Sequence, residues 1–210
     1  MQEASLGCLA LKSHLFMKKV LLWLPALALA MLTFQCAQEA PKTEEKVAAT
    51  VESEEDLVKR GEYLVTTGGC EDCHSPKMMT DKGPVPDPKL RMSGHPAGVK
   101  LAPISDPKIV GPWVLFHPMS TASVGPWGTS FSANLTPHET GIKEWSFEQF
   151  KRALTEGKSK GLENGRPLLP PMPWPNYINM KEEDMKAIFA FLKSLSPVDN
   201  LVPAPIPPVQ

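Results

Sequence analysis

The feature that most constrains this chain is the pentapeptide Cys70-Glu71-Asp72-Cys73-His74. Two thiols separated by two residues can each form a thioether with one of the two vinyl groups of a single haem. The histidine that follows directly is then carried beneath the ring, where its imidazole can ligate the iron. The motif therefore predicts one covalent haem c, with its iron, attached through Cys70 and Cys73 and ligated on one face by His74.

Two other uses of a Cys-x-x-Cys pair fit this chain less well. A redox-active dithiol opens a helix that follows a strand in a βαβ unit, whereas the segment before Cys70 is helical in pattern and no alternating strands follow it. A structural zinc site needs four ligands, usually as two separated pairs. The remaining cysteines are Cys8 and Cys36, which lie in or before an export signal.

Residues 1–36 are expected to be that export signal. A basic head at Met17-Lys18-Lys19 precedes an apolar run from Val20 to Phe34, and a polar exit follows. The run is too short to span a bilayer comfortably, as is typical of a secretory signal peptide. Residues 1–16 have no use in such a signal, so Met17 is the expected initiator. We expect the domain that follows to lie outside the cytoplasm.

Cys36 stands where a lipoprotein signal places the cysteine that is acylated after cleavage. The match is imperfect, because Thr33 and Gln35 occupy positions where a leucine and a small residue are preferred. The sequence leaves three outcomes open: lipoprotein-type cleavage before Cys36 with membrane anchoring through its acyl group, ordinary cleavage nearby, or a retained anchor helix. The acidic, Ala-rich residues 37–55 are expected to be a flexible tether.

Residues 56–196 are enough for one domain and too few for two. The formal net charge of the whole chain is −1, and such a weakly acidic balance argues against a nucleic-acid partner, which would call for a clustered basic face. Residues 197–210 are rich in proline and are expected to form an extended surface tail.

Three stretches show helical periodicity: 53–67, 146–156 and 181–194. Ser53 is a capping residue, Gly157 ends the second stretch, and Pro197 ends the third. Gly61 and Tyr63 on the first helix, with Phe189 on the last, predict that these two helices cross closely, because a helix-interior glycine allows two backbones to approach.

Residues 76–141 are rich in proline and glycine, which predicts a long loop without regular elements. Large rings recur within it at Trp113, Phe116, Trp127 and Phe131. They are too many for a disordered linker, so we expect the loop to be ordered and to cover the haem or one of its edges.

Met172 is the expected second axial ligand of the iron. It lies in the stretch Leu168–Trp174, whose prolines cannot form a helix and hold the chain extended, so that a thioether can be pressed onto the open haem face. A thioether raises the reduction potential relative to a second histidine. The other methionines lack such a strap. His95, His117 and His138 are ligands in principle but are expected to be surface or loop histidines.

From Tyr63 to Asn200 the chain resembles the single-haem cytochrome c domains of bacterial respiratory chains and of dehydrogenase cytochrome subunits. The resemblance is carried by Gly61–Val65, Cys70–Pro76, Ala133–Pro137, Thr140–Ile142 with Trp145, and Leu169–Trp174. It implies an all-α cytochrome c fold with a long Pro/Gly-rich loop insertion between the haem motif and the later helices. It also implies thioethers at Cys70 and Cys73 and axial ligation by His74 and Met172. The residues that could hydrogen-bond the haem propionates, or equally well serve loop structure, are Asn134, Thr136, Arg166 and Trp174.

The resemblance implies an electron carrier in the periplasm, or on the outer face of a bacterial membrane, rather than an enzyme. Its expected partners are a redox donor and acceptor, such as a dehydrogenase, a respiratory complex or an oxidase. Relatives in dehydrogenases often carry two or three haem motifs, whereas this sequence shows one. The alternative is a haem enzyme, or a gas or peroxide sensor, in which the sixth iron position is open or labile.

Overall fold

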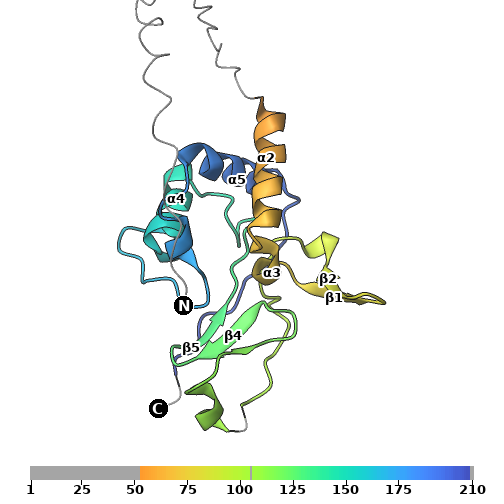
Figure 1. Ribbon diagram of the computed structural model, residues 1–210, viewed down its shortest axis with the longest axis vertical. Helices are drawn as coiled ribbons and strands as arrows, with labels where there is room; N and C mark the ends of the chain where they lie inside the picture. Colours follow the sequence, from red (N-terminus) through yellow and green to blue (C-terminus); the bar gives the residue numbers. More distant parts are fainter. Residues whose placement is uncertain (1–52, 105, 209–210) are drawn as a thin grey trace, which may run out of the picture. The chain divides into compact units, whose positions relative to one another are not determined.

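A computed structural model describes residues 53–104 and 106–208 of the chain. The export signal, Cys36 and most of the tether lie outside these described residues. Within them the helices are α2 (Glu54–Thr67), α3 (Cys70–His74), α4 (Phe147–Glu156) and α5 (Glu182–Ser194), as Figure 1 shows. The strands are β1 (Lys77–Thr80), β2 (Gly83–Pro86), β3 (Leu115–Phe116), β4 (Ala122–Gly125) and β5 (Gly128–Phe131). Short 3-10 helices are η1 (Pro88–Leu90), η2 (Pro107–Val110), η3 (Ser159–Gly161) and η4 (Trp174–Tyr177).

The three predicted long helices form within one residue of their expected ends. Ser53 caps α2, since its side chain accepts a hydrogen bond from the backbone N–H of Asp56. Ser146 and Gln149 form a reciprocal capping box at the start of α4, and Gly157 ends that helix with a left-handed φ of 63°. These local signals account for the agreement.

The predicted crossing of α2 and α5 is confirmed, but its aromatic partner is different. A Cβ atom on Gly61 would lie 2.0 Å from the carbonyl oxygen of Ala187 and 2.7 Å from the Cβ of Phe191. Phe189 instead packs against α4, with its ring centroid 5.3 Å from that of Phe150. Positions two apart on a helix point to nearly opposite sides, so Phe191 faces α2 and Phe189 does not. Tyr63 takes no part in the crossing, because it is 67% exposed.

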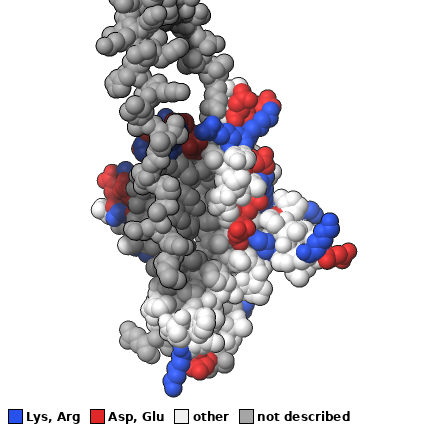
Figure 2. Space-filling view, viewed as in Figure 1, with Lys and Arg blue, Asp and Glu red and all other residues white. Residues whose placement is uncertain are grey.

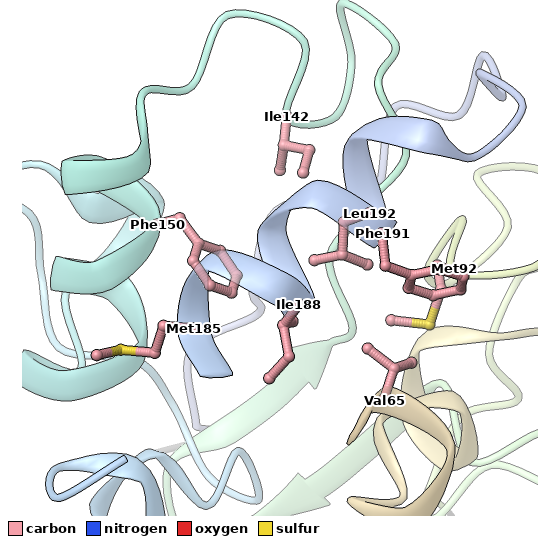
Figure 3. Close-up of a cluster of buried hydrophobic side chains, with 8 residues drawn as sticks. All are labelled: Val65, Met92, Ile142, Phe150, Met185, Ile188, Phe191 and Leu192. Carbon is pink, nitrogen blue, oxygen red and sulfur yellow. The ribbon is translucent and has the colours of Figure 1, made fainter. Parts of the chain in front are cut away.

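Helix α5 is the centre of the hydrophobic core. Figure 3 shows Phe150 of α4 on one side of it, and Val65 of α2 with Met92 on the other. The buried apolar cluster consists of Val65, Met92, Ile142, Phe150, Met185, Ile188, Phe191 and Leu192. Three helices and two loop residues thus share one core.

The predicted all-α character is not confirmed, because the middle of the chain forms two small antiparallel sheets, β1-β2 and β3-β4-β5. Gly83 and Gly128 have φ values of 103° and 94°, and each directly follows the two turn residues of its hairpin, between β1 and β2 and between β4 and β5. Glycine adopts such a positive φ without strain. Pro84 and Pro86 lie in β2, which pairs on one side only. The glycines and prolines that argue against helices are thus compatible with these short hairpins.

The proline-rich tail is hydrogen-bonded to the rest of the domain. The Asn200 side-chain amide donates to the carbonyl oxygens of Ser93 (2.7 Å) and His95 (2.9 Å). Farther on, Ile206 and Thr129 of β5 exchange backbone hydrogen bonds of 2.8 and 3.0 Å. The tail thus adds to the edge of the sheet. In the part of the chain that the structure describes, no helix is both long and apolar enough to cross a membrane.

Candidate functional site

The Cys-x-x-Cys-His motif forms the short helix α3, directly after α2. Gly69 caps its start in the left-handed conformation, with φ 68°. Cys70 and Cys73 are three residues apart on this helix, so their side chains lie on one face. Burial raises the pKa of both thiols. A redox-active dithiol is typically activated by the opposite shift of its thiol pKa.

His74 has one ring nitrogen engaged and one available. Its Nδ1 lies 2.8 Å from the backbone carbonyl oxygen of Ala133. A carbonyl can only accept, so Nδ1 carries the proton and donates it, which leaves the lone pair of Nε2 free for a metal. Burial is the largest cause that lowers the pKa of His74, and it favours the neutral imidazole that ligation requires.

A cavity of about 330 Å³ brings together all four residues that the sequence singled out: Cys70, Cys73, His74 and Met172. Helices α2, α4 and α5 contribute apolar walls to it. The apolar and aromatic side chains of the lining are Val65, Met92, Phe116, Leu135, Phe150, Leu154, Tyr177, Met180, Ile188 and Leu192. Among the lining residues, Asp72 is the one acidic side chain.

The strap that carries Met172 is hydrogen-bonded to the rest of the fold at two points before the methionine. At its base, the backbone N–H of Leu168 donates to the carbonyl oxygen of Gly157 at 2.6 Å. Farther along, the hydroxyl of Ser130 on β5 donates to the carbonyl oxygen of Pro170 at 2.6 Å. Pro171, Met172 and Pro173 then line the cavity. The middle region therefore positions the methionine strap, which the sequence did not reveal.

Met92 is a cavity residue that sequence reasoning missed. It is fully buried and sits at a left-handed φ of 59°. The hydroxyl of Ser75 accepts its backbone N–H at 2.9 Å and lies 3.8 Å from its Sδ. Nothing in its local sequence distinguishes it from the other loop methionines. Met92 lines the cavity because its loop folds back against Ser75, next to the haem-motif helix, and this contact is not visible in the local sequence.

The donor set fits a covalently held haem. Two thiols on one helical face, an imidazole with a free Nε2 and a thioether converge on a cavity whose walls are almost entirely apolar. Apolar walls suit the macrocycle, and the imidazole and the thioether are iron ligands. Across residues 53–104 and 106–208, no group of three or more His, Cys, Asp and Glu side chains is placed to hold a metal ion by itself.

The candidate propionate residues serve other contacts and are not part of the cavity lining. Asn134 donates to the carbonyl oxygen of Val198 in the tail at 2.9 Å, and its Oδ1 accepts the N–H of Thr136 at 3.0 Å. Arg166 donates to the carbonyl oxygen of Pro167. Trp174 packs over Gly157, so that a Cβ on that glycine would lie 2.4 Å from its ring. These contacts favour a role in loop structure over hydrogen bonding to the haem propionates.

His95 lies in a loop, as expected, but it is not a surface residue, because it has no exposed surface. Its ring lies 2.9 Å from the Thr121 hydroxyl and 3.3 Å from the Val99 carbonyl oxygen. It is buried because the loop folds onto the β4–β5 hairpin, where its ring meets Phe131. His95, His117 and His138 all lie outside the set of cavity-lining residues.

Comparison with known proteins gives the family. Residues 58–196 match the family model for cytochrome c. The chain is similar to the gluconate 2-dehydrogenase cytochrome c subunit of Pantoea cypripedii, with 35% identity over 157 residues, which are 71% of this chain and 27% of that protein. It is also similar to the cytochrome c subunit of the quinone alcohol dehydrogenase of Gluconacetobacter polyoxogenes, with 27% identity over 169 residues, 80% of this chain and 28% of that protein.

A shorter match of 87 residues, 37% identical, links the chain to the fructose dehydrogenase cytochrome subunit of Gluconobacter japonicus and covers 40% of this chain and 16% of that protein. The chain spans less than a third of the length of each of these relatives. The family match covers most of the described domain and includes both the motif of α3 and the methionine strap. The chain therefore belongs to the cytochrome c family.

Proposed function

We propose that this protein is a one-electron carrier that holds a single haem c through Cys70 and Cys73, with His74 and Met172 as axial ligands. The observation that carries the proposal is the convergence of Met172 and the distant haem motif, with its Cys70, Cys73 and His74, on one apolar cavity. Haem supplies an iron centre that alternates between the ferric and ferrous states. The chain supplies attachment, ligation and a dry environment.

The side chains around the cavity suit electron transfer better than bond chemistry. Val65, Leu135, Phe150 and Ile188 exclude water from the site. The imidazole of His74 is held in one tautomer by Ala133. Asp72 is the one carboxylate among the described lining residues, so the lining offers no pair for general acid and base catalysis.

The names of the relatives bear on the partner. Those proteins are named as cytochrome subunits of gluconate, alcohol and fructose dehydrogenases. We propose that this chain likewise receives electrons from a dehydrogenase and passes them to a respiratory acceptor. We further propose that residues 1–36 direct it to the periplasm or the outer face of a bacterial membrane, and that acylated Cys36 anchors it there.

Haem staining of denaturing gels tests the attachment. The full chain is expressed in a bacterial host that exports it and attaches haem c, alongside Cys70→Ser, Cys73→Ser and the control Cys36→Ser. We expect the haem stain to stay with the wild type and with Cys36→Ser, and to weaken in Cys70→Ser and in Cys73→Ser. It should disappear when both substitutions are combined in one chain. A wild-type chain that gives no stain would overturn the proposal.

Two further measurements test the carrier role and the location. A potentiometric titration of the wild-type holoprotein should follow a single one-electron transition, and more than one transition would exclude a single haem. Fractionation should place the wild type with the membranes and Cys36→Ser with the soluble exported fraction. Equal distribution of the two proteins would contradict the anchor while leaving the carrier proposal intact.

A further inference from the structure

Lys77, the first residue of β1, caps the end of the haem-motif helix. Its Nζ donates to the carbonyl oxygens of Glu71 (2.8 Å), Asp72 (3.0 Å) and Ser75 (2.6 Å). A charged lysine carries three N–H groups, whereas a neutral amine carries two. Three carbonyl acceptors around one Nζ therefore match the three N–H groups of the ammonium form. Lys77 is a fixed positive charge at this end of α3.

The position of the Lys77 ammonium group stabilises the end of α3 in two ways, by hydrogen bonding and by electrostatics. Helix α3 has 5 residues, and its last carbonyls have few partners within so short a helix. The carbonyl end of a helix is also its negative end, where a cation is stabilising. Because the three accepting residues flank Cys73 and His74, the ammonium group holds the turn that carries one thioether site and the axial histidine.

The β1–β2 hairpin holds Lys77 in place. Lys77 pairs with Pro86 across the hairpin, and Asp87, the residue after β2, donates its backbone N–H to the carbonyl oxygen of Pro76 at 2.8 Å. Figure 1 shows the hairpin following α3 directly. The base of the hairpin thus fixes the backbone from which the Lys77 side chain returns to the helix.

Lys77 lies three residues after the axial histidine in the chain. The carbonyl oxygens that its Nζ contacts belong to residues on both sides of His74, so the ammonium charge lies close to that ligand. The ferric form of a haem centre carries one more positive charge than the ferrous form. A fixed cation on the histidine side opposes that extra charge, most strongly where the surroundings exclude water.

We propose that Lys77 is a positioning residue that secures the turn of α3 and whose charge raises the reduction potential of the haem iron. This inference rests on the proposed one-electron function. It assigns to the β1–β2 hairpin a role in setting the potential, which the sequence pattern alone does not indicate.

Midpoint potentials of the full-chain holoprotein and its variants test the proposal. In Lys77→Gln the charge is removed, and the amide can still donate two hydrogen bonds. We expect its midpoint potential to shift to more negative values. Lys77→Arg keeps the charge and should stay closer to the wild type. The matched control is Lys82→Gln, which removes a charge from the exposed turn of the same hairpin and should leave the potential unchanged.

The outcomes separate this inference from the function on which it rests. If the wild type retains no haem, the proposed function fails. If Lys77→Gln forms holoprotein with a normal spectrum and an unchanged potential, or if Lys82→Gln shifts the potential equally, the role of Lys77 is disproved. If Lys77→Gln does not assemble, Lys77→Arg decides: a potential near that of the wild type supports the role of the charge, and a clear negative shift overturns it.

Discussion

A Cβ atom placed on Gly61 would lie 2.0 Å from the carbonyl oxygen of Ala187, so α2 and α5 meet backbone to backbone. This contact sets the distance between two walls of the haem cavity. Val65, one turn beyond Gly61, and Ile188, the neighbour of Ala187, both line that cavity. The crossing therefore links the stability of the fold to the shape of the site.

Gly61→Ala is expected to destabilise the holoprotein strongly. The methyl group would meet a backbone carbonyl that cannot rotate away, and overpacking of this kind costs about 1–3 kcal/mol or more of the free energy of unfolding. The control is Gly98→Ala, since a Cβ at that position has no atom within 4 Å. Denaturant unfolding measures both variants. Equal midpoints for the two would contradict the close crossing.

Arg91 joins three helices, and its loss is expected to weaken their packing. Its Nη1 lies 2.6 Å from Glu62 of α2, its Nε is hydrogen-bonded to Glu71 of α3, and its guanidinium lies 4.9 Å from the ring centroid of Phe191 on α5. Arg91→Met leaves the Glu71 side chain, 16% exposed, without this partner, which costs about 1–3 kcal/mol.

Arg91→Lys should be intermediate in stability, because it keeps the charge but loses the forked geometry. The control is Lys59→Met, which breaks an exposed pair with Glu55 on the same helix and should have no measurable effect. Thermal unfolding of the holoproteins gives the order. If Arg91→Met were as stable as Lys59→Met, the pairing of Arg91 with Glu71 would be unimportant for stability.

Ser130 is expected to hold the methionine strap against the iron site. Ser130→Ala removes the 2.6 Å hydrogen bond to Pro170, two residues before Met172. The strap should then move more freely, and a larger fraction of reduced protein should bind carbon monoxide. Ser123→Ala is the control, since that hydroxyl contacts Ser130 at 2.9 Å but not the strap. Carbon monoxide titration followed by absorbance distinguishes the two, and equal binding would argue against anchoring by Ser130.

Acid is expected to destabilise the domain through His95. Burial is the main cause that lowers the pKa of His95 from its usual 6.5, and the neighbouring ring of His117 lowers it further. The folded state thus favours neutral His95, while the unfolded state takes up a proton near pH 6.5. The contribution to stability is full above that pH and is lost as the pH falls through the lowered pKa.

Urea unfolding at a series of pH values measures this effect. His95→Gln keeps one donor and one acceptor but cannot titrate, so its stability should depend less on pH below about 6.5 than that of the wild type. His138→Gln, which changes a histidine at another site, should retain the acid sensitivity. A pH dependence in His95→Gln identical to that of the wild type would refute the role of His95.

The long helices could be predicted because their signals are local. Ser53, Ser146 and Gly157 act at the helix ends that they mark, and the apolar period fixes the buried face. The Cys-x-x-Cys-His motif of α3 is also local, and its residue types and spacing by themselves predict haem attachment. The apolar period shows which residues of a helix are buried, but it does not show which neighbouring helix each of them contacts. The predicted partner of Gly61 was therefore Phe189, whereas the structure places Phe191 there.

The middle region was harder to predict because its order comes from tertiary contacts. Its strands are two to four residues long, too short for a clear period of two. The burial of Met92 and His95 depends on hydrogen bonds to Ser75 and Thr121, which are distant in sequence.

Figure 2 shows acidic and basic side chains interspersed on the visible face over α2, in keeping with the net charge of −1.

The visible spectrum of the reduced full-chain holoprotein, with and without carbon monoxide, tests the central claim most directly. The wild type should show no change, Met172→Ala should show a clear shift, and the control Met180→Leu, at another methionine of the same cavity, should behave as the wild type. A shift in the wild type would mean an open or labile iron and would favour an enzyme or a sensor. An unchanged spectrum in Met172→Ala would mean that another residue ligates the iron.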